Sequence, residues 1–182
     1  MRKIIAGLFI SLDGVVEAPQ DWHFPYFNDE MGEAVTAQAE ASDTMLLGRK
    51  TYEEFASYWP NQSSDEPFAD VMNGTPKLVA STTLTSVEWQ NSTLIEGDVV
   101  DALKRIKEQP GKAISITGSP TLVRSLLRAG ILDELRLLVH PIVVGHGKRL
   151  FEAEDAPIPL RLVEAKTFST GVQAMTYAPA AD

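Results

Sequence analysis

Short apolar runs alternate with segments of helical periodicity along most of this chain. Residues 3–12 and 44–47 are almost continuously apolar, as expected of strands buried on both faces of a sheet. Residues 49–58 then space their apolar side chains at helical intervals, which predicts a helix with one buried stripe. The same criteria predict helices at 28–41, 98–107 and 119–129, and strands at 77–80, 93–95, 113–117 and 135–144.

The pattern changes near the end of the chain. Residues 160–168 and 172–177 read as the two strands of a hairpin that turns at Ser169-Thr170-Gly171. Strands that alternate with helices, followed by strands alone, indicate an α/β fold with a mostly parallel central sheet and an antiparallel C-terminal hairpin. For a chain of this length we expect a single domain over residues 1–182.

Glycines and short polar residues follow several of the predicted strands directly. Asp13, Gly48, Ser81 and Gly118 each stand just after a strand. The carboxyl ends of parallel strands meet at one edge of a sheet, and ligands bind in the crevice at that edge. We therefore expect these four residues on one rim, where a nucleotide would bind.

Two of the four positions also begin a predicted helix. Gly48-Arg49-Lys50-Thr51 brings two cations and a hydroxyl to a first helical turn, where backbone N–H groups lack partners. Gly118-Ser119-Pro120-Thr121 repeats the arrangement, with Ser119 as the expected N-cap. Both segments suit a phosphate group. The alternative is that the glycines only form turns and that the cations are solvated surface charges.

A long loop, residues 15–27, is rich in rings. It contains Trp22, Phe24 and Phe27 and shows neither helical nor strand periodicity. Long loops inside compact domains are often functional. These aromatic side chains either line a pocket for a planar ligand or plug the end of the sheet, and the sequence favours neither alternative.

Composition and charge exclude several classes of function. A net charge of −9 argues against non-specific binding to nucleic acid or to an anionic membrane. The absence of cysteine excludes disulfides, thiolate catalysis and cysteine-ligated zinc. We expect no metal site, because His23, His140 and His146 lie far apart in the sequence. No apolar stretch is long enough to span a bilayer, and we expect a cytoplasmic protein.

Several of these motifs, in this order, resemble one family. Residues 47–53 are similar to the Gly-Arg-x-Thr-aromatic-Glu segment of the dihydrofolate reductase superfamily. Residues 11–14, 118–122 and 141–145 resemble the Ser-x-Asp-Gly turn, the Gly-Gly-Pro-x-Leu cofactor turn and the Pro-x-x-x-Gly strand in the reductase domain of riboflavin-biosynthesis deaminase/reductases. Ser119 departs from this pattern, because it replaces the second glycine of the cofactor turn. The chain is identified as a stand-alone member of the dihydrofolate reductase-like superfamily, with its three-layer fold.

The resemblance implies an NADPH-dependent reductase of a small pterin- or pyrimidine-like substrate. The implied cofactor residues are Arg49, Lys50, Ser81 and Thr82 for the 2′-phosphate, and Gly48, Thr51, Gly118, Ser119 and Thr121 around the pyrophosphate. Asp13 would border the nicotinamide, and either Asp29 or Glu30 would anchor the substrate and assist its protonation. A non-catalytic protein that binds the nucleotide without turnover is the alternative. A homodimer is also expected, because the strand at 135–144 and the terminal hairpin carry much β-branched and leucine surface.

Overall fold

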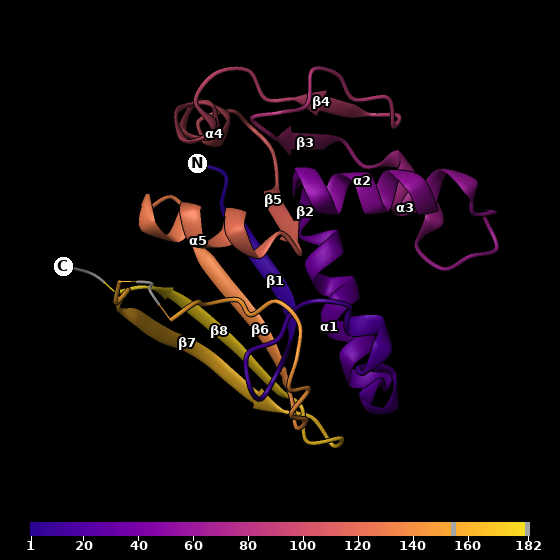
Figure 1. Cartoon of the computed structure of the whole chain (residues 1–182), viewed down its shortest axis with the longest axis vertical. Coiled ribbons are helices and arrows are strands. Elements are labelled where there is room, and N and C mark those ends of the chain that lie inside the picture. Colours follow the sequence, from indigo (N-terminus) through magenta and orange to yellow (C-terminus); the bar gives the residue numbers. More distant parts are fainter. Residues whose placement is uncertain (154–155, 181–182) are drawn as a thin grey trace.

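The computed structural model describes residues 1–153 and 156–180, and its strands form one eight-stranded sheet (Figure 1). The order across the sheet is β4-β3-β2-β5-β1-β6-β8-β7. The strands are β1 (Ile4–Ser11), β2 (Ser42–Gly48), β3 (Lys77–Ala80), β4 (Ser92–Leu94), β5 (Ala113–Thr117), β6 (Glu134–His140), β7 (Leu160–Thr167) and β8 (Gln173–Pro179). Pairing is parallel from β4 to β6 and antiparallel from β6 through β8 to β7. The mostly parallel sheet with an antiparallel C-terminal hairpin is therefore confirmed.

Helices cover both faces of the sheet. They are α1 (Asp29–Glu40), α2 (Arg49–Tyr58), α3 (Ala69–Gly74), α4 (Val99–Lys107) and α5 (Pro120–Arg128). Alternate residues of β1 point to opposite faces, so Ile4 and Leu8 join the core with α4 and α5, while Phe9 packs near Met31 of α1. Tyr52 of α2 packs on Leu47 of β2, on the same side as α1. The result is the expected three-layer arrangement.

One element boundary differs from the predicted one, and one helix was not predicted. β6 stops at His140 rather than at residue 144, because Pro141 has no N–H for a ladder. The following residues turn back toward the loop after β1, where the Leu12 N–H donates to the carbonyl of Ile142. The helix α3 lies between the predicted helix at 49–58 and the predicted strand at 77–80, where no helix was predicted. It begins after Phe68, which has φ 70°, and no side chain caps it.

The parallel strands bring their carboxyl ends to one edge. Gly48 pairs with Ala80, and Gly7 pairs with both Thr117 and Arg136. The ends of β2, β3 and β5 thus share a rim, as the sequence predicted, whereas β1 and β6 run on past Gly7 and Arg136 to Ser11 and His140. Among the helices in the described part of the chain, none has the length and apolar character needed to cross a membrane.

Candidate functional site

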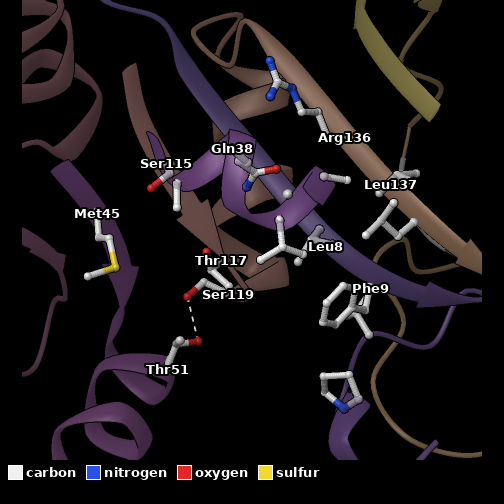
Figure 2. A pocket seen from close by; sticks show the side chains of 18 of the residues that line it. Leu8, Phe9, Gln38, Met45, Thr51, Ser115, Thr117, Ser119, Arg136 and Leu137 are labelled. Carbon is white, nitrogen blue, oxygen red and sulfur yellow. Dashed lines mark hydrogen bonds between the residues drawn. The ribbon is translucent and has the colours of Figure 1, made fainter. Parts of the chain in front are cut away.

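A cavity of about 1560 Å³ opens at this rim and extends over the sheet face that carries α1 and α2 (Figure 2). Its lining includes most of the predicted cofactor residues, namely Gly48, Arg49, Lys50, Thr51, Gly118, Ser119 and Thr121. Single-ligand pockets usually have volumes of about 300–1,000 Å³. The cavity therefore has room for a cofactor and a substrate together.

Two helices present uncapped N-termini to this cavity. No side chain caps α2 at Gly48 or α5 at Ser119. The other two long helices are capped, because Asn28 accepts from the Met31 N–H of α1 and an aspartate caps α4 in the same way. Uncapped first turns leave N–H groups free and carry partial positive charge. The N-termini of α2 and α5 can therefore donate hydrogen bonds from their free N–H groups to an anion in the cavity.

Ser119 joins these two helix starts instead of capping its own helix. Its hydroxyl oxygen accepts from the Gly48 N–H at 2.9 Å, and it donates to the Thr51 hydroxyl at 2.8 Å. Gly118 has φ 83° and Ser119 has φ 55°, so both residues of the turn adopt the left-handed region. The left-handed backbone at position 119 is one that glycine adopts without strain. Serine accepts some backbone strain at this position and gains two hydrogen bonds.

The mouth of the cavity carries three cations. Arg49 forms an ion pair with Glu53 at 2.9 Å, and both side chains are about half exposed. Lys50 lies beside Lys148, and this like charge lowers the pKa of Lys148. Two ammonium groups in contact at the surface repel each other, and a bound anion would relieve that repulsion. Lys148 was not among the residues expected at the site from the sequence, although it lines the same cavity.

Asp13 holds the turn that carries Lys148. Its carboxylate accepts from the N–H groups of Val144 at 3.0 Å and Gly145 at 2.9 Å, and from the Ser11 hydroxyl at 2.6 Å. These bonds, the Ser11 contact foremost, keep the pKa of Asp13 far below its usual value. Asp13 is absent from the cavity lining. In this geometry it orders a loop as an ionised group, and the predicted position beside the nicotinamide stays a prediction.

The predicted acids of α1 differ from each other. Glu30 lines the cavity, whereas Asp29 is exposed outside the lining. The Glu30 carboxylate accepts from the Ser169 N–H at 2.8 Å, and this bond lowers the pKa of Glu30. A carboxylate so engaged is ionised near neutral pH and is a poor proton donor.

Five other predicted residues lie outside the cavity lining. Ser81 stands one residue beyond Ala80, near Gly48 on the rim, and its hydroxyl accepts from the Thr83 and Leu84 N–H groups, as in a turn. The remaining four are Thr82, Trp22, Phe24 and Phe27. Trp22 is buried against His140, while Phe24 and Phe27 are 63% and 50% exposed. The alternative in which this loop covers the end of the sheet fits these positions. The aromatic side chains that do line the cavity are Phe9, Phe55, Trp59, Phe68 and Phe168.

The fold is of the dihydrofolate reductase type. The cavity at its rim is large enough to hold a nucleotide. Dihydrofolate reductase from Enterococcus faecalis, solved with NADP(H) and RAB-propyl, superimposes with a TM-score of 0.63 at 15% identity, over 97% of this chain and 96% of that one. A pyrimidine reductase-like protein from Corynebacterium diphtheriae gives a TM-score of 0.69 at 14% identity, over 100% and 93% of the two chains. At such identities the likeness shows the fold alone.

Sequence similarity defines the family. Residues 2–174 match the RibD C-terminal domain, and the chain belongs to that family. The Bacillus subtilis (strain 168) protein YyaP, described as uncharacterised, is 31% identical over 182 residues, covering 97% of this chain and 94% of YyaP. The predicted membership of a dihydrofolate reductase-like superfamily, close to riboflavin-biosynthesis reductase domains, is therefore confirmed.

Proposed function

We propose that this protein is an NADPH-dependent reductase of a small pterin- or pyrimidine-like substrate. The observation that carries the proposal is the pair of uncapped helix starts, α2 and α5, tied together by Ser119 and flanked by Lys50 and Lys148. Paired N-termini with adjacent cations suit a pyrophosphate. Membership of the RibD C-terminal domain family and the fold of an NADP(H)-binding reductase point the same way.

The residues divide the dinucleotide between them. The first turns of α2 and α5, with Thr51 and Lys148, would hold the pyrophosphate. Arg49 and the Ser81-Thr82 segment would hold the adenosine 2′-phosphate, since Ser81 follows the strand that pairs with β2. When bound, NADPH supplies a hydride to an unsaturated ring. The protein's part is to bind, orient and enclose the two reactants on the sheet face.

A protein that binds the nucleotide without turnover is the second candidate. The volume of the cavity favours the enzyme, because about 1560 Å³ exceeds the usual range for one ligand. The lining continues past the rim over Gly7, Phe9 and Thr117 of the sheet face, where a second ligand would lie beside the first.

The experiment has two steps. Titration with NADPH, followed by the quenching of tryptophan fluorescence, tests the cofactor site, and saturable binding is expected. Oxidation of NADPH, followed by absorbance across a panel of pterins and pyrimidines, then tests turnover. No binding would refute the nucleotide site. Binding without oxidation by any of the panel compounds would favour the second candidate.

We also propose a homodimer that forms through the C-terminal strands. β7 is the edge strand of the sheet, and Leu162 and Val163 in it are 52% and 51% exposed. Exposed edge strands with apolar side chains tend to pair with another chain unless something covers them. A second copy of this chain would cover both the edge and its apolar side chains.

A further inference from the structure

The floor of the cavity contains an unengaged side-chain amide at Gln38. This half-buried residue of α1 lines the cavity and makes no side-chain hydrogen bond within residues 1–153 and 156–180. The amide lies directly against Gly7 of β1, because a Cβ added to Gly7 would stand only 2.1 Å from Nε2 of Gln38 and 2.4 Å from its Oε1. Glycine at position 7 thus makes the space that the Gln38 amide occupies.

The register of the sheet surrounds this amide with defined neighbours. Gly7 pairs with Thr117 on one side and with Arg136 on the other, so these three residues form a row under α1. Thr117, an exposed residue with a hydroxyl group, also lines the cavity. Figure 2 shows the Gln38 amide between Thr117 and Arg136. The row offers uncharged donors and acceptors at its centre.

Two carboxylates near this row, Glu134 and Glu30, are already engaged. Arg136 donates from Nε at 3.0 Å and from Nη2 at 2.6 Å to the Glu134 carboxylate, which also accepts from Lys3 at 2.7 Å. Burial alone would raise the pKa of Glu134, but these two cations hold it below its usual value. Glu30, two turns before Gln38 on α1, is bound to the Ser169 N–H. Neither carboxylate is available as the main anchor of a ligand.

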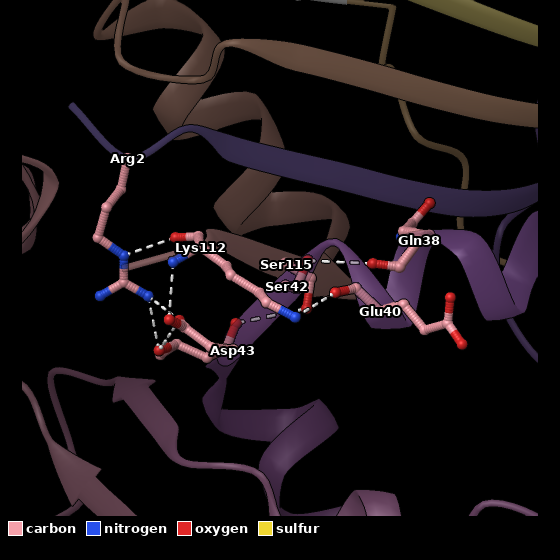
Figure 3. A network of polar contacts seen from close by, with 8 residues as sticks. Arg2, Gln38, Glu40, Ser42, Asp43, Lys112 and Ser115 are labelled. Carbon is pink, nitrogen blue, oxygen red and sulfur yellow. Dashed lines mark hydrogen bonds and ion pairs between the residues drawn. The ribbon is translucent and has the colours of Figure 1, made fainter. Parts of the chain in front are cut away.

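The end of α1 that carries Gln38 is held rigidly. Ser42 donates to the Gln38 carbonyl at 3.1 Å, and Lys112 donates from Nζ to the Glu40 carbonyl at 2.9 Å (Figure 3). The Lys112 N–H donates in turn to Asp43, which forms an ion pair with Arg2. This network ties the last turn of α1 to β2, β5 and the N-terminal segment. The backbone of Gln38 is thereby fixed over β1, as a recognition residue requires.

We propose that Gln38 is the specificity-determining residue of the substrate site and selects a neutral heteroaromatic ring with a lactam edge. A primary amide offers one acceptor and one donor in a single plane, which complements the adjacent N–H and C=O of a lactam. A carboxylate offers two acceptors and complements the amidinium edge that forms when the ring nitrogen of an amidine is protonated, because that edge has two donors. This inference rests on the proposed reductase function, because it names the substrate chemistry of the same cavity.

The test uses two pteridines of the same skeleton, lumazine with lactam edges and 2,4-diaminopteridine with amidine edges. Fluorescence titrations of the full chain without cofactor should show tighter binding of lumazine. Gln38→Glu should shift the ratio of the two dissociation constants by about tenfold or more toward the diamino compound, the value of one charge-assisted hydrogen bond. Gln109→Glu, an exposed glutamine outside the cavity, is the matched control and should leave the ratio unchanged.

A second variant changes the position of the amide and keeps its chemistry. Gly7→Ala should displace the flexible end of Gln38 and weaken lumazine binding several-fold, while thermal unfolding confirms that the chain still folds. A wild-type preference for 2,4-diaminopteridine would point to a carboxylate such as Glu33 as the anchor and overturn the assignment. An unchanged ratio in Gln38→Glu would overturn it as well.

NADPH titration of the same proteins separates the two proposals. The Gln38 variants should bind NADPH as the wild type does, because the cationic mouth and the two helix starts lie outside the altered row. Normal NADPH binding with no lumazine preference would refute the role of Gln38 and leave the reductase proposal standing. Failure of the wild type to bind NADPH would refute the cofactor site, whatever the pteridines show.

Discussion

Single charges at the mouth of the cavity have separable roles. The Arg49–Glu53 pair spans one helical turn and is about half exposed, so it contributes little to stability. Arg49 is therefore free to exchange Glu53 for a phosphate at small cost. Lys148 instead comes from a turn after β6 and lies beside Lys50 of α2. Under the proposed function, Arg49 would meet the adenosine end of the dinucleotide and Lys148 would meet its centre.

Arg49→Ala should remove much of the preference for NADPH over NADH. The 2′-phosphate, which only NADPH carries, loses a charge-assisted contact worth about 1.5–3 kcal/mol, or roughly tenfold or more in affinity. Binding of NADH should hardly change. Fluorescence titration with both cofactors measures the ratio, with Arg105→Ala on α4 as a control for loss of an exposed arginine. Equal dissociation constants for the two cofactors in the wild type would contradict the assignment.

Lys148→Ala should weaken NADPH and NADH by the same factor. Both cofactors contain the pyrophosphate, so the expected loss is about tenfold for each. Calorimetric titration checks this, with Lys104→Ala as a control in which an exposed lysine of α4 is removed. A loss confined to NADPH would place Lys148 at the 2′-phosphate instead.

At the scale of elements, the loop after β1 is anchored by rings. His23 stacks on Phe9 with centroids 4.7 Å apart, and its ring lies 6.1 Å from that of His140 at the end of β6. Both histidines are buried, and burial is the main cause that lowers the pKa of each. Nδ1 of His23 and Nε2 of His140 have no hydrogen-bond partner in the described structure. The cluster is therefore stable with both rings neutral.

Acid should lower the free energy of unfolding through this histidine cluster. The folded state binds protons on His23 and His140 less readily than the unfolded chain, so stability falls as pH drops below the unfolded value of about 6.5. Each histidine contributes a slope of up to about 1.4 kcal/mol per pH unit in that window. Urea unfolding between pH 7.5 and 5 measures the slope. His23→Phe and His140→Phe should each reduce it, whereas His146→Asn at an exposed turn should not. An identical slope in all four proteins would exclude the cluster as its source.

For the whole molecule, the exposed edge strand β7 is the feature that bears on the proposed dimer. The helices cover the sheet from β2 to β6, whereas β7 is exposed along nearly its whole length (Figure 1). Leu162 and Val163 are then available for a second copy of the chain. Pairing through this strand would extend the sheet, and because Val163 also lines the cavity, the second copy would stand next to part of the cavity lining.

Leu162→Glu combined with Val163→Glu should convert a dimer to a monomer. In a dimer the two introduced carboxylates would be buried in an apolar contact. They would lose their hydration there and gain no partner, which is unfavourable by several kcal/mol. Light scattering at micromolar concentration should give twice the chain mass for the wild type and the single mass for the variant. Leu12→Glu, an exposed leucine far from β7, is the control. A monomeric wild type would refute the dimer.

What the sequence determined by itself was local and periodic. Buried strands, amphipathic helices and strand-end glycines follow from side-chain spacing and backbone sterics, so the layered fold and the helix starts at Gly48 and Gly118 were predictable. Because the carboxyl ends of parallel strands meet at one edge of a sheet, these two glycines could also be expected on one rim. The order of the motifs along the chain indicated the family, and the match to the RibD C-terminal domain over residues 2–174 confirms it.

Only the tertiary structure decided which side chains face the cavity. Trp22, Phe24 and Phe27 fold over the end of the sheet, because the 3₁₀ turns of their loop direct them toward His140 and solvent. Lys148 reaches the rim because Asp13 binds its turn, a contact across 131 positions of sequence to Val144. Gln38 meets Gly7 because α1 packs on β1. Contacts between residues so distant in sequence depend on strand order, register and helix packing, and no local spacing encodes them.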